Sequence, residues 1–333
     1  MTVLHQGFIT FFLLLFLMVP HAHSKTTKIG FLLSTLQEER YQKDKKYFED
    51  KAHQLGAEVV FYASDNSERV QARKMENLLL KNVDVVVIQP VNSHAASTLV
   101  EMAKESQVPV IAYDRIIENA DLDLYVTQNS REVGRLQAKA AVEATKGAGN
   151  YILLMGQAGH SVAQEITEGV KEVLKDYPKI KIVVEQNHDG WSASKAMATV
   201  ENALTKFGGK IDAILANNSG MANGAVQAIS GFDPKLAGKI FVAGADADLA
   251  AIKNITKGLQ HFEVLKDIQL LAETSAQIAY DLANGKGIDS KDSLWNGKKK
   301  VKVINTPVFP VSKNDIEKTI IKRGFHTRES IYQ

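Results

Sequence analysis

Short apolar runs alternate with amphipathic segments along most of this chain, and this alternation constrains the fold more than any other feature. Successive apolar runs begin roughly 25 residues apart, with a segment of helical periodicity between them. Such spacing is typical of βαβ units, in which crossover helices join parallel strands. In the first half of the chain, strands and helices are expected at residues 28–33, 40–55, 58–62, 70–80, 83–88, 92–106 and 108–113.

The alternation restarts after Lys146-Gly147-Ala148-Gly149, which ends an expected helix at 131–145. The second series is expected at residues 150–155, 165–176, 180–185, 193–207, 211–216, 221–230, 240–243 and 249–257. A chain of 333 residues is too long for one compact core. The sequence therefore predicts an α/β protein of two similar Rossmann-like lobes with parallel sheets, which meet near residues 124–131 without a Ser/Gly linker.

The C-terminal part departs from the alternation. A longer helix is expected at 266–284, followed by a lysine-rich polar stretch up to residue 300. Residues 301–311 are expected to be extended, and Pro307 and Pro310 indicate an edge strand or a crossing segment. A short helix is expected at 315–322.

The first 24 residues differ in kind from the rest and predict an export signal. Residues 8–19 are apolar apart from one threonine, a run too short to cross a bilayer, which needs about 20 residues. Ala22 and Ser24 form a small-x-small cleavage pattern, which predicts a mature chain that begins at Lys25. Because residues 1–7 contain no Lys or Arg, an uncleaved membrane anchor is the alternative. A chain without cysteine cannot carry a lipoprotein anchor, so we expect a periplasmic location.

Composition excludes several classes of function. The 40 basic and 38 acidic residues give a net charge of +2, so no basic surplus indicates nucleic-acid binding. The absence of cysteine removes thiolate metal sites, cysteine nucleophiles and disulfides. The histidines are scattered, and residues 121–123 lack the remaining ligands of a calcium loop. We therefore expect no metal, no cofactor and no enzymatic activity.

Polar and aromatic side chains follow the expected strands, at the edge where open α/β sheets bind ligands. The apolar run 110–113 ends directly at Asp114 and Arg115, and each of these residues alone has an ordinary structural explanation. Their joint placement at one edge of two sheets favours a site. Hydrogen-bonding groups with an aromatic platform are typical of carbohydrate recognition. The candidate residues at strand ends are Arg40, Tyr41, Asp114, Arg115, Trp191, Asn218, Asp246 and Lys266.

Several of these stretches resemble the periplasmic sugar-binding proteins of ABC importers, and most closely their xylose-binding branch. The resemblance covers essentially the whole mature chain. It implies two Rossmann-like lobes joined by a three-segment hinge, the type I fold of periplasmic binding proteins. The stretches that carry it are 39–44, 112–115, 136–140, 189–191, 246–250 and 322–326.

The resemblance also implies domain boundaries and roles. The N-terminal lobe would be residues 25–129 plus 266–300, and the C-terminal lobe 130–265 plus 301–333. The site would hold xylose or a related pentose or hexose. Tyr41, at a position where the xylose branch tends to have tryptophan, would form an aromatic sandwich with Trp191. Sugar oxygens would be held by Arg40, Asp114 and Arg115 from the N-terminal lobe, and by Trp191, Asn218, Asp246 and Lys266 from the C-terminal lobe and the hinge.

The loop 157–164 departs from the branch. It is one residue shorter and lacks the Asp and Asn that supply hydrogen bonds there. Ser219 and Ala245 also stand where the branch has an acidic and a polar residue, respectively. A lost hydrogen bond costs about 0.5–1.5 kcal/mol. Either His160 or Gln164 replaces the lost groups, or the preference has moved to another pentose, or the affinity is weaker.

These features favour a monomeric transport receptor that binds a monosaccharide, closes, and presents both lobes to a membrane ABC permease. A sensory partner of a membrane histidine kinase or chemoreceptor is the alternative, since the same fold serves both. An enzyme is disfavoured because Gly156 to Gly159 lacks the remainder of a phosphate-binding motif. A sugar-responsive repressor would need a helix-turn-helix where this chain has its expected signal.

Overall fold

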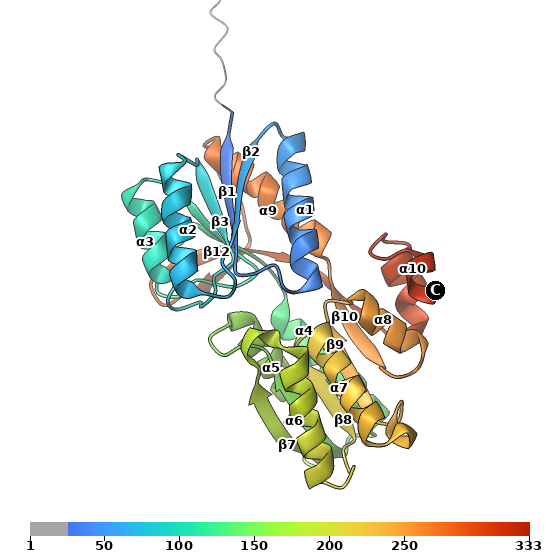
Figure 1. The fold of residues 1–333 in the computed structure, drawn as a ribbon. Coiled ribbons are helices and arrows are strands. Elements are labelled where there is room, and N and C mark those ends of the chain that lie inside the picture. The colour runs from blue at the N-terminus through green and yellow to red at the C-terminus, as the bar shows by residue number, and fades with distance from the viewer. Residues whose placement is uncertain (1–25) are drawn as a thin grey trace, which may run out of the picture.

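The computed structural model describes residues 26–333, which form two α/β lobes, one above the other (Figure 1). The predicted signal segment and its cleavage site lie outside the described residues. A seven-stranded sheet forms the centre of the N-terminal lobe and a six-stranded sheet that of the C-terminal lobe. This architecture confirms the predicted two-lobed fold with mostly parallel sheets.

The sheet of the N-terminal lobe has the strand order β11-β12-β5-β4-β3-β1-β2. All neighbouring strands are parallel except β11, which is antiparallel to β12. Helices α1 and α9 lie on one face, and α2 and α3 on the other. The elements are β1 (Lys28–Leu33), α1 (Glu39–Gln54), β2 (Glu58–Ala63), α2 (Glu68–Leu80), β3 (Val85–Ile88), α3 (Ser97–Glu105), β4 (Val110–Tyr113), β5 (Leu124–Gln128), α9 (Ile268–Ala283), β11 (Asp292–Trp295) and β12 (Lys300–Thr306).

The sheet of the C-terminal lobe has the order β13-β10-β9-β8-β6-β7, with only β13 antiparallel to its neighbour. Helix α4 packs on α5, and α6 on α7. The elements are α4 (Ser130–Ala144), β6 (Gly149–Met155), α5 (Ser161–Leu174), β7 (Ile180–Asn187), α6 (Ala193–Lys206), β8 (Ala213–Ala216), α7 (Ser219–Phe232), β9 (Phe241–Ala245), α8 (Leu249–Thr256), β10 (Phe262–Lys266), β13 (Val308–Val311), a π-helical turn (Ile316–Ile321) and α10 (Arg328–Tyr332).

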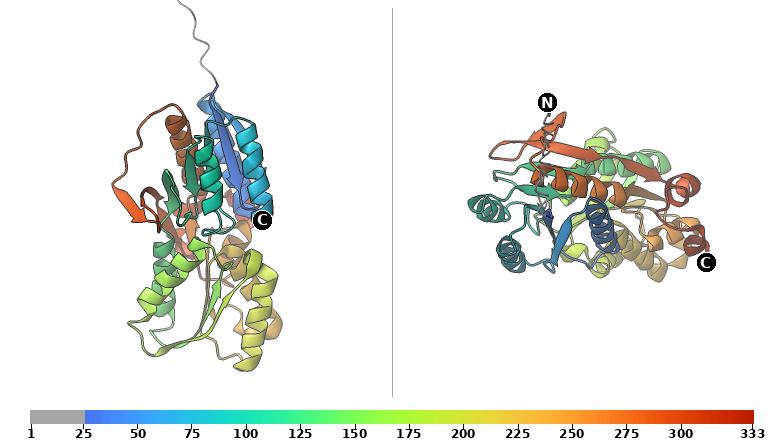
Figure 2. Two further views of the ribbon diagram at one scale, coloured as in Figure 1. Left: turned by 90° about the vertical axis from the view of Figure 1, so that its left-hand side faces the viewer. Right: turned by 90° about the horizontal axis from the view of Figure 1, so that it is seen from above.

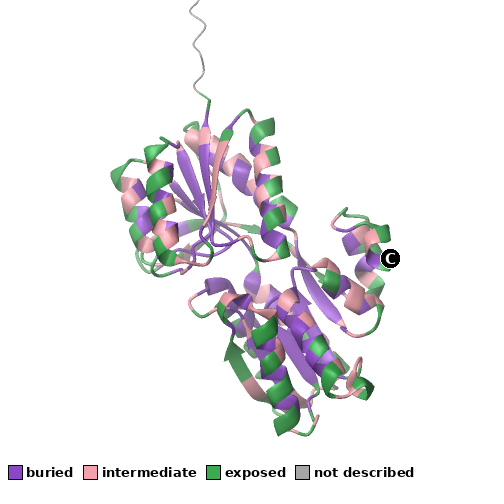
Figure 3. Ribbon diagram, viewed as in Figure 1, coloured by how far each residue is buried: buried purple, intermediate pink, exposed green. Residues whose placement is uncertain are grey.

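Burial explains why the central strands read as unbroken apolar runs. Val85 and Val87 of β3 pack under α1 and α9, whereas Val86 and Ile88 pack under α2 and α3. Successive side chains of a strand point to opposite faces, so a strand covered on both sides has no solvent-facing positions. In Figure 3 these strands are purple while the outer surfaces of the helices are largely green. The edge strand β7, by contrast, has five exposed residues among eight.

Three chain segments cross between the lobes, after β5, after β10 and between β12 and β13. The third crossing corrects the expected domain boundary. Residues 301–306 were expected in the C-terminal lobe, but they form most of β12, which pairs with β5 in the N-terminal sheet. The crossing lies at Pro307, which cannot donate a ladder hydrogen bond. Lys266 likewise ends β10 and does not open the following helix, which begins at Ile268.

The two lobes meet along the edges at which their parallel strands end (Figure 2). Loops from opposite lobes exchange hydrogen bonds there. The amide of Ser93 donates to the carbonyl of Gly159 at 3.2 Å, and the amide of Ile116 donates to Oγ of Ser161 at 3.2 Å. The residues that follow the strands of each sheet therefore face those of the other lobe.

Candidate functional site

All eight residues nominated at the strand ends line one small cavity between the lobes. Its volume is about 10 Å³, enough for roughly one water molecule. Glu38 and Val162 complete the lining and were not predicted. The lining residues are Glu38, Arg40, Tyr41, Asp114, Arg115, Val162, Trp191, Asn218, Asp246 and Lys266.

Three of these residues have backbone conformations that side chains rarely adopt. The φ angles are +64° at Asp114, +54° at Trp191 and +96° at Asp246. Asp114 follows β4 directly and Asp246 follows β9 directly, so both chains turn sharply where the strand ends. Such conformations cost about 1–3 kcal/mol each and concentrate at functional sites. Their recurrence in this cavity makes it a candidate site.

Arg40 is the centre of the charge network. It lies in the first turn of α1, where the i,i+4 spacing places Asp44 next to it, with 3.3 Å between Nε and Oδ2. Its other nitrogens lie 3.4 Å from Asp114 and 3.6 Å from Asp246 of the opposite lobe. Because Arg40 is 3% exposed, these carboxylates supply the charge compensation that its burial requires.

Asp114 is ionised in this environment. Burial alone would raise its pKa, but the positive charges of Arg40, Lys266 and Arg115 and a hydrogen bond from Gln89 lower the pKa below its ordinary value. The amide Nε2 of Gln89 donates to Oδ2 at 2.9 Å. The carboxylate therefore remains an acceptor throughout the neutral range.

Arg115 is 1% exposed and forms its hydrogen bonds with uncharged groups. Its Nη1 donates to the carbonyl of Pro90 at 3.1 Å, and its Nη2 donates to the hydroxyl of Tyr41 at 2.9 Å. Nη1 also lies 3.4 Å from Nε2 of His160 in the other lobe. Its Nε has no partner.

Trp191 forms the wall contributed by the C-terminal lobe. Its indole Nε1 donates to Nδ1 of His160 at 2.7 Å. Burial, and then the charge of Arg115, lowers the pKa of His160 to about 2, so the imidazole is neutral and can accept this bond. The ring lies over Gly156, where an added Cβ would stand 2.5 Å from it. Only glycine leaves room for the indole in this position.

Asn218, Asp246 and Lys266 complete the site from three neighbouring strands. Asn218 caps α7, and its Oδ1 accepts from the amide of Met221 at 2.9 Å. Nζ of Lys266 lies 2.7 Å from Oδ1 of Asp246, and both side chains are almost fully buried. Asp246 therefore bridges Lys266 of its own lobe and Arg40 of the other.

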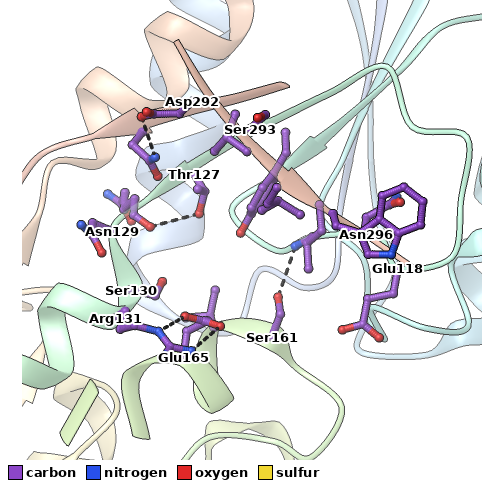
Figure 4. A pocket seen from close by; sticks show the side chains of 18 of the residues that line it. Glu118, Thr127, Asn129, Ser130, Arg131, Ser161, Glu165, Asp292, Ser293 and Asn296 are labelled. Atoms are coloured by element: carbon purple, nitrogen blue, oxygen red, sulfur yellow. Dashed lines mark hydrogen bonds and ion pairs between the residues drawn. The ribbon is translucent and has the colours of Figure 1, made fainter. Parts of the chain in front are cut away.

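His160 and Gln164, the two candidates to replace the Asp and Asn missing from loop 157–164, do not line the cavity. His160 stands behind the cavity, where it supports Trp191 and faces Arg115. Gln164 lies in a larger groove of about 970 Å³ beside the hinge. In Figure 4 this groove is bordered by Thr127 of β5 and Asn129 of the hinge, by Arg131 and Glu165 of the C-terminal lobe, and by Asp292 and Asn296 of the N-terminal lobe. None of the eight nominated residues lines it.

Within residues 26–333, no group of three or more His, Asp or Glu side chains is arranged to hold a metal ion. In the same part of the chain, no helix is both long enough and apolar enough to span a membrane.

Comparison with known proteins identifies relatives along nearly the whole chain. A sequence model described as a periplasmic binding protein domain matches residues 29–287. The D-xylose-binding periplasmic protein of Haemophilus influenzae is 42% identical over 93% of this chain and 94% of its own length. The protein of the same name from Escherichia coli K12 is also 42% identical, with the same coverage.

Solved structures agree with these sequence relatives. A carbohydrate transporter solute binding protein from Chloroflexus aurantiacus, in complex with D-glucose, superposes with a TM-score of 0.83 at 27% identity, covering 92% of this chain and 98% of that one. An ABC transporter solute binding protein from Bacillus halodurans C-125, with bound myo-inositol, gives 0.79 at 26% identity, covering 89% and 98%. These matches confirm the resemblance inferred from the sequence motifs.

Proposed function

Because the chain belongs to the periplasmic binding protein domain family, we propose that it binds one monosaccharide between its lobes, with D-xylose the first candidate, and delivers it to the permease of an ABC importer. The ligand-binding residues on this proposal are Arg40, Tyr41, Asp114, Arg115, Trp191, Asn218, Asp246 and Lys266.

The observation that carries the proposal is the convergence of these eight residues on one inter-lobe cavity. Carboxylate, amide, guanidinium and ammonium groups can hydrogen-bond to adjacent sugar hydroxyls. The rings of Tyr41 and Trp191 offer apolar faces for the C–H side of a pyranose. The names of the relatives, which refer to D-xylose, make this pentose the first candidate.

Binding on this account requires the lobes to separate. The cavity is smaller than any sugar, and the ion pair between Arg40 and Asp246 spans it. Hinge motion at the three crossings would admit the ligand, whose hydroxyls would then mediate the contacts between the two lobes. Closure needs no bond-breaking chemistry, which fits a family of binding proteins.

Calorimetric titration of the mature chain, residues 25–333, tests the proposal. We expect saturable binding of D-xylose at one site per chain, with weaker binding of at least some of ribose, arabinose and glucose. A flat titration against all four sugars would contradict the proposal.

Export to the periplasm is part of the same proposal, supported by the periplasmic names of the relatives and by the expected signal in residues 1–24. N-terminal sequencing of the exported protein should return Lys25 as the first residue. A product that starts near Met1 would instead indicate an uncleaved anchor.

A monomer that presents both lobes to a permease is the expected functional form. The alternative recipient of the closed protein is a membrane histidine kinase or chemoreceptor. Capture from solubilised membranes with sugar-loaded protein, followed by identification of the bound protein, distinguishes the two recipients.

A further inference from the structure

Glu38 lines the cavity but was not among the residues predicted from the sequence. It immediately precedes α1, and its carboxyl oxygen Oε1 is sealed from solvent without a hydrogen-bond partner. A buried acceptor that is left unsatisfied costs about 1–3 kcal/mol. Its position on the cavity wall indicates that a ligand group completes it.

A matching donor lies on the same wall. Arg115 uses Nη1 and Nη2 for Pro90 and Tyr41, whereas its Nε is buried and unpartnered. The hydroxyl of Tyr41 links the two residues, because it accepts from Arg115 and donates to the Glu38 carboxyl. The free acceptor Oε1 of Glu38 and the free donor Nε of Arg115 therefore belong to two residues that are both hydrogen-bonded to Tyr41. A hydroxyl group can satisfy both, since it donates one hydrogen bond and accepts another.

On the opposite wall, Asn218, Asp246 and Lys266 supply polar groups, but residues 157–174 supply none. Val162 is the only residue of α5 in the lining, and it is apolar. Both ring nitrogens of His160 face Trp191 and Arg115, and Gln164 lies in the hinge groove. Ser219 donates to the carbonyl of Ala245 and contacts Glu263, so its hydroxyl is engaged away from the cavity.

We propose that Glu38 is a ligand-binding and specificity-determining residue, and that its free carboxylate oxygen and Nε of Arg115 together bind one hydroxyl of the sugar. The inference rests on the proposed function and extends it. It assigns recognition of this hydroxyl to the N-terminal lobe, and it implies that monosaccharides without a hydroxyl at that position bind poorly.

Because Glu38 titrates near neutral pH, the proposal predicts that sugar affinity depends on pH. Burial raises its pKa to about 7, against lowering by Arg115 and by the hydrogen bond from Tyr41. Above pH 7 the charged carboxylate accepts from the sugar; below pH 7 the acid is protonated and loses the charge that strengthens this hydrogen bond. Other charged groups lie around Glu38 and the same cavity. They are Arg40 on α1, Asp114 and Arg115 after β4, Asp246 and Asp248 after β9, and Lys266 on β10.

The test measures sugar affinity of the mature protein between pH 5.5 and 8.0, with D-xylose as the first probe. We expect wild-type affinity to fall roughly tenfold across this range as the pH decreases. Glu38→Gln and Glu38→Leu should bind roughly tenfold more weakly at pH 8.0 and lose most of the pH dependence. The matched control is Glu39→Gln, which removes the same charge from the next residue, an exposed side chain paired with Lys43, and should bind as the wild type does.

Asp248 needs a separate control, because burial and the charge of Asp246 raise its pKa to about 8. Asp248→Asn should retain the pH dependence that Glu38 contributes. Melting curves of every variant establish that the fold is intact.

A deoxy-sugar series separates direct contact from a structural role. The wild type should bind one mono-deoxy analogue about tenfold more weakly than the parent sugar. Glu38→Leu should bind this analogue and the parent sugar with nearly equal affinity. If no analogue shows such coupling, or if Glu38→Leu binds within twofold of the wild type with unchanged pH dependence, the inference is overturned alone. If the wild type binds no sugar, the proposed function is overturned and this inference with it.

Discussion

Asp114 combines a strained backbone with a buried negative charge. Its left-handed backbone directs the carboxylate into the cavity immediately after β4. There it lies 3.4 Å from Arg40 and accepts a hydrogen bond from Gln89. The unfavourable backbone conformation is retained because the surrounding charges hold the side chain in place.

We expect Asp114→Ala to weaken sugar binding at least a hundredfold, because on the proposed function its carboxylate would accept two charge-assisted hydrogen bonds from the sugar, worth about 1.5–3 kcal/mol each. The protein should still fold, since Arg40 keeps Asp44 and Asp246 as partners. Calorimetry and thermal melting check the two expectations. Asp121→Ala, which removes an exposed carboxylate paired with Lys299, is the control and should bind normally. Unchanged affinity in Asp114→Ala would mean that the site is misplaced.

Gly156 offers a test of the aromatic wall. A Cβ there would lie 2.5 Å from the Trp191 ring and would push the indole into the cavity. Overpacking of this kind costs about 1–3 kcal/mol, so Gly156→Ala should lower sugar affinity roughly tenfold. Gly231→Ala, a helical position with no atom near the added methyl, should leave affinity unchanged. Equal affinities in the two variants would show that the position of Trp191 does not matter.

At the scale of residues, position along a strand was enough to predict which side chains lie together between the lobes. Asp114, Trp191, Asn218 and Asp246 were found because each follows a predicted strand, and parallel strands end at a common edge. Glu38 was missed because an acid before a helix is usually solvated, and its burial depends on the opposite lobe. Gln164 was one of two alternatives because the sequence could not tell which side of α5 faces the cavity, and the structure places it in the hinge groove.

At the level of elements, most buried strands were predicted, but the buried strand β5 and the peripheral strand β11 were not. β3, β4 and β8 carry only apolar residues with both faces covered, so their apolar runs identified them. β11 was missed because it is an exposed edge strand within a polar, lysine-rich stretch. β12 alternates buried and exposed residues, which indicates a strand, but this pattern does not say which sheet it joins.

Strand β10 carries a buried acid, Glu263, that should make stability depend on pH. Burial raises its pKa to about 8. Hydrogen bonds from the backbone amide of Ala247 and from the side chains of Ser219 and Gln260 lower the pKa and only partly offset this effect. The unfolded chain has an ordinary glutamate pKa, so between about pH 4.5 and 8 only the folded state holds the proton. Stability from this group therefore falls as the pH rises through that window.

Glu263→Gln should remove this dependence, because the amide is neutral at every pH. Relative to the wild type, the variant should gain up to about 4 kcal/mol in the free energy of unfolding on going from pH 5 to pH 8.5. Denaturant unfolding at the two pH values measures the gain. An identical difference between variant and wild type at both pH values would show that Glu263 does not titrate in this window.

For the molecule as a whole, the internal repetition of the βα series was enough to predict two lobes and their facing edges. The sequence could not predict how tightly the lobes meet. That depends on ion pairs such as Arg40–Asp246 and on the hydrogen bond from Ser93 to Gly159, which join residues far apart in the chain. The site therefore exists only when the lobes come together, so ligand binding and closure should be coupled.

Fluorescence of Trp191 tests most directly whether a sugar binds between the lobes. The chain has two tryptophans, and Trp295 is 68% exposed and outside the cavity lining, so Trp295→Phe leaves Trp191 as the single reporter. Addition of D-xylose to this variant should change the emission saturably, with a midpoint equal to the calorimetric dissociation constant. Calorimetric binding without any change in Trp191 emission would contradict binding in this cleft.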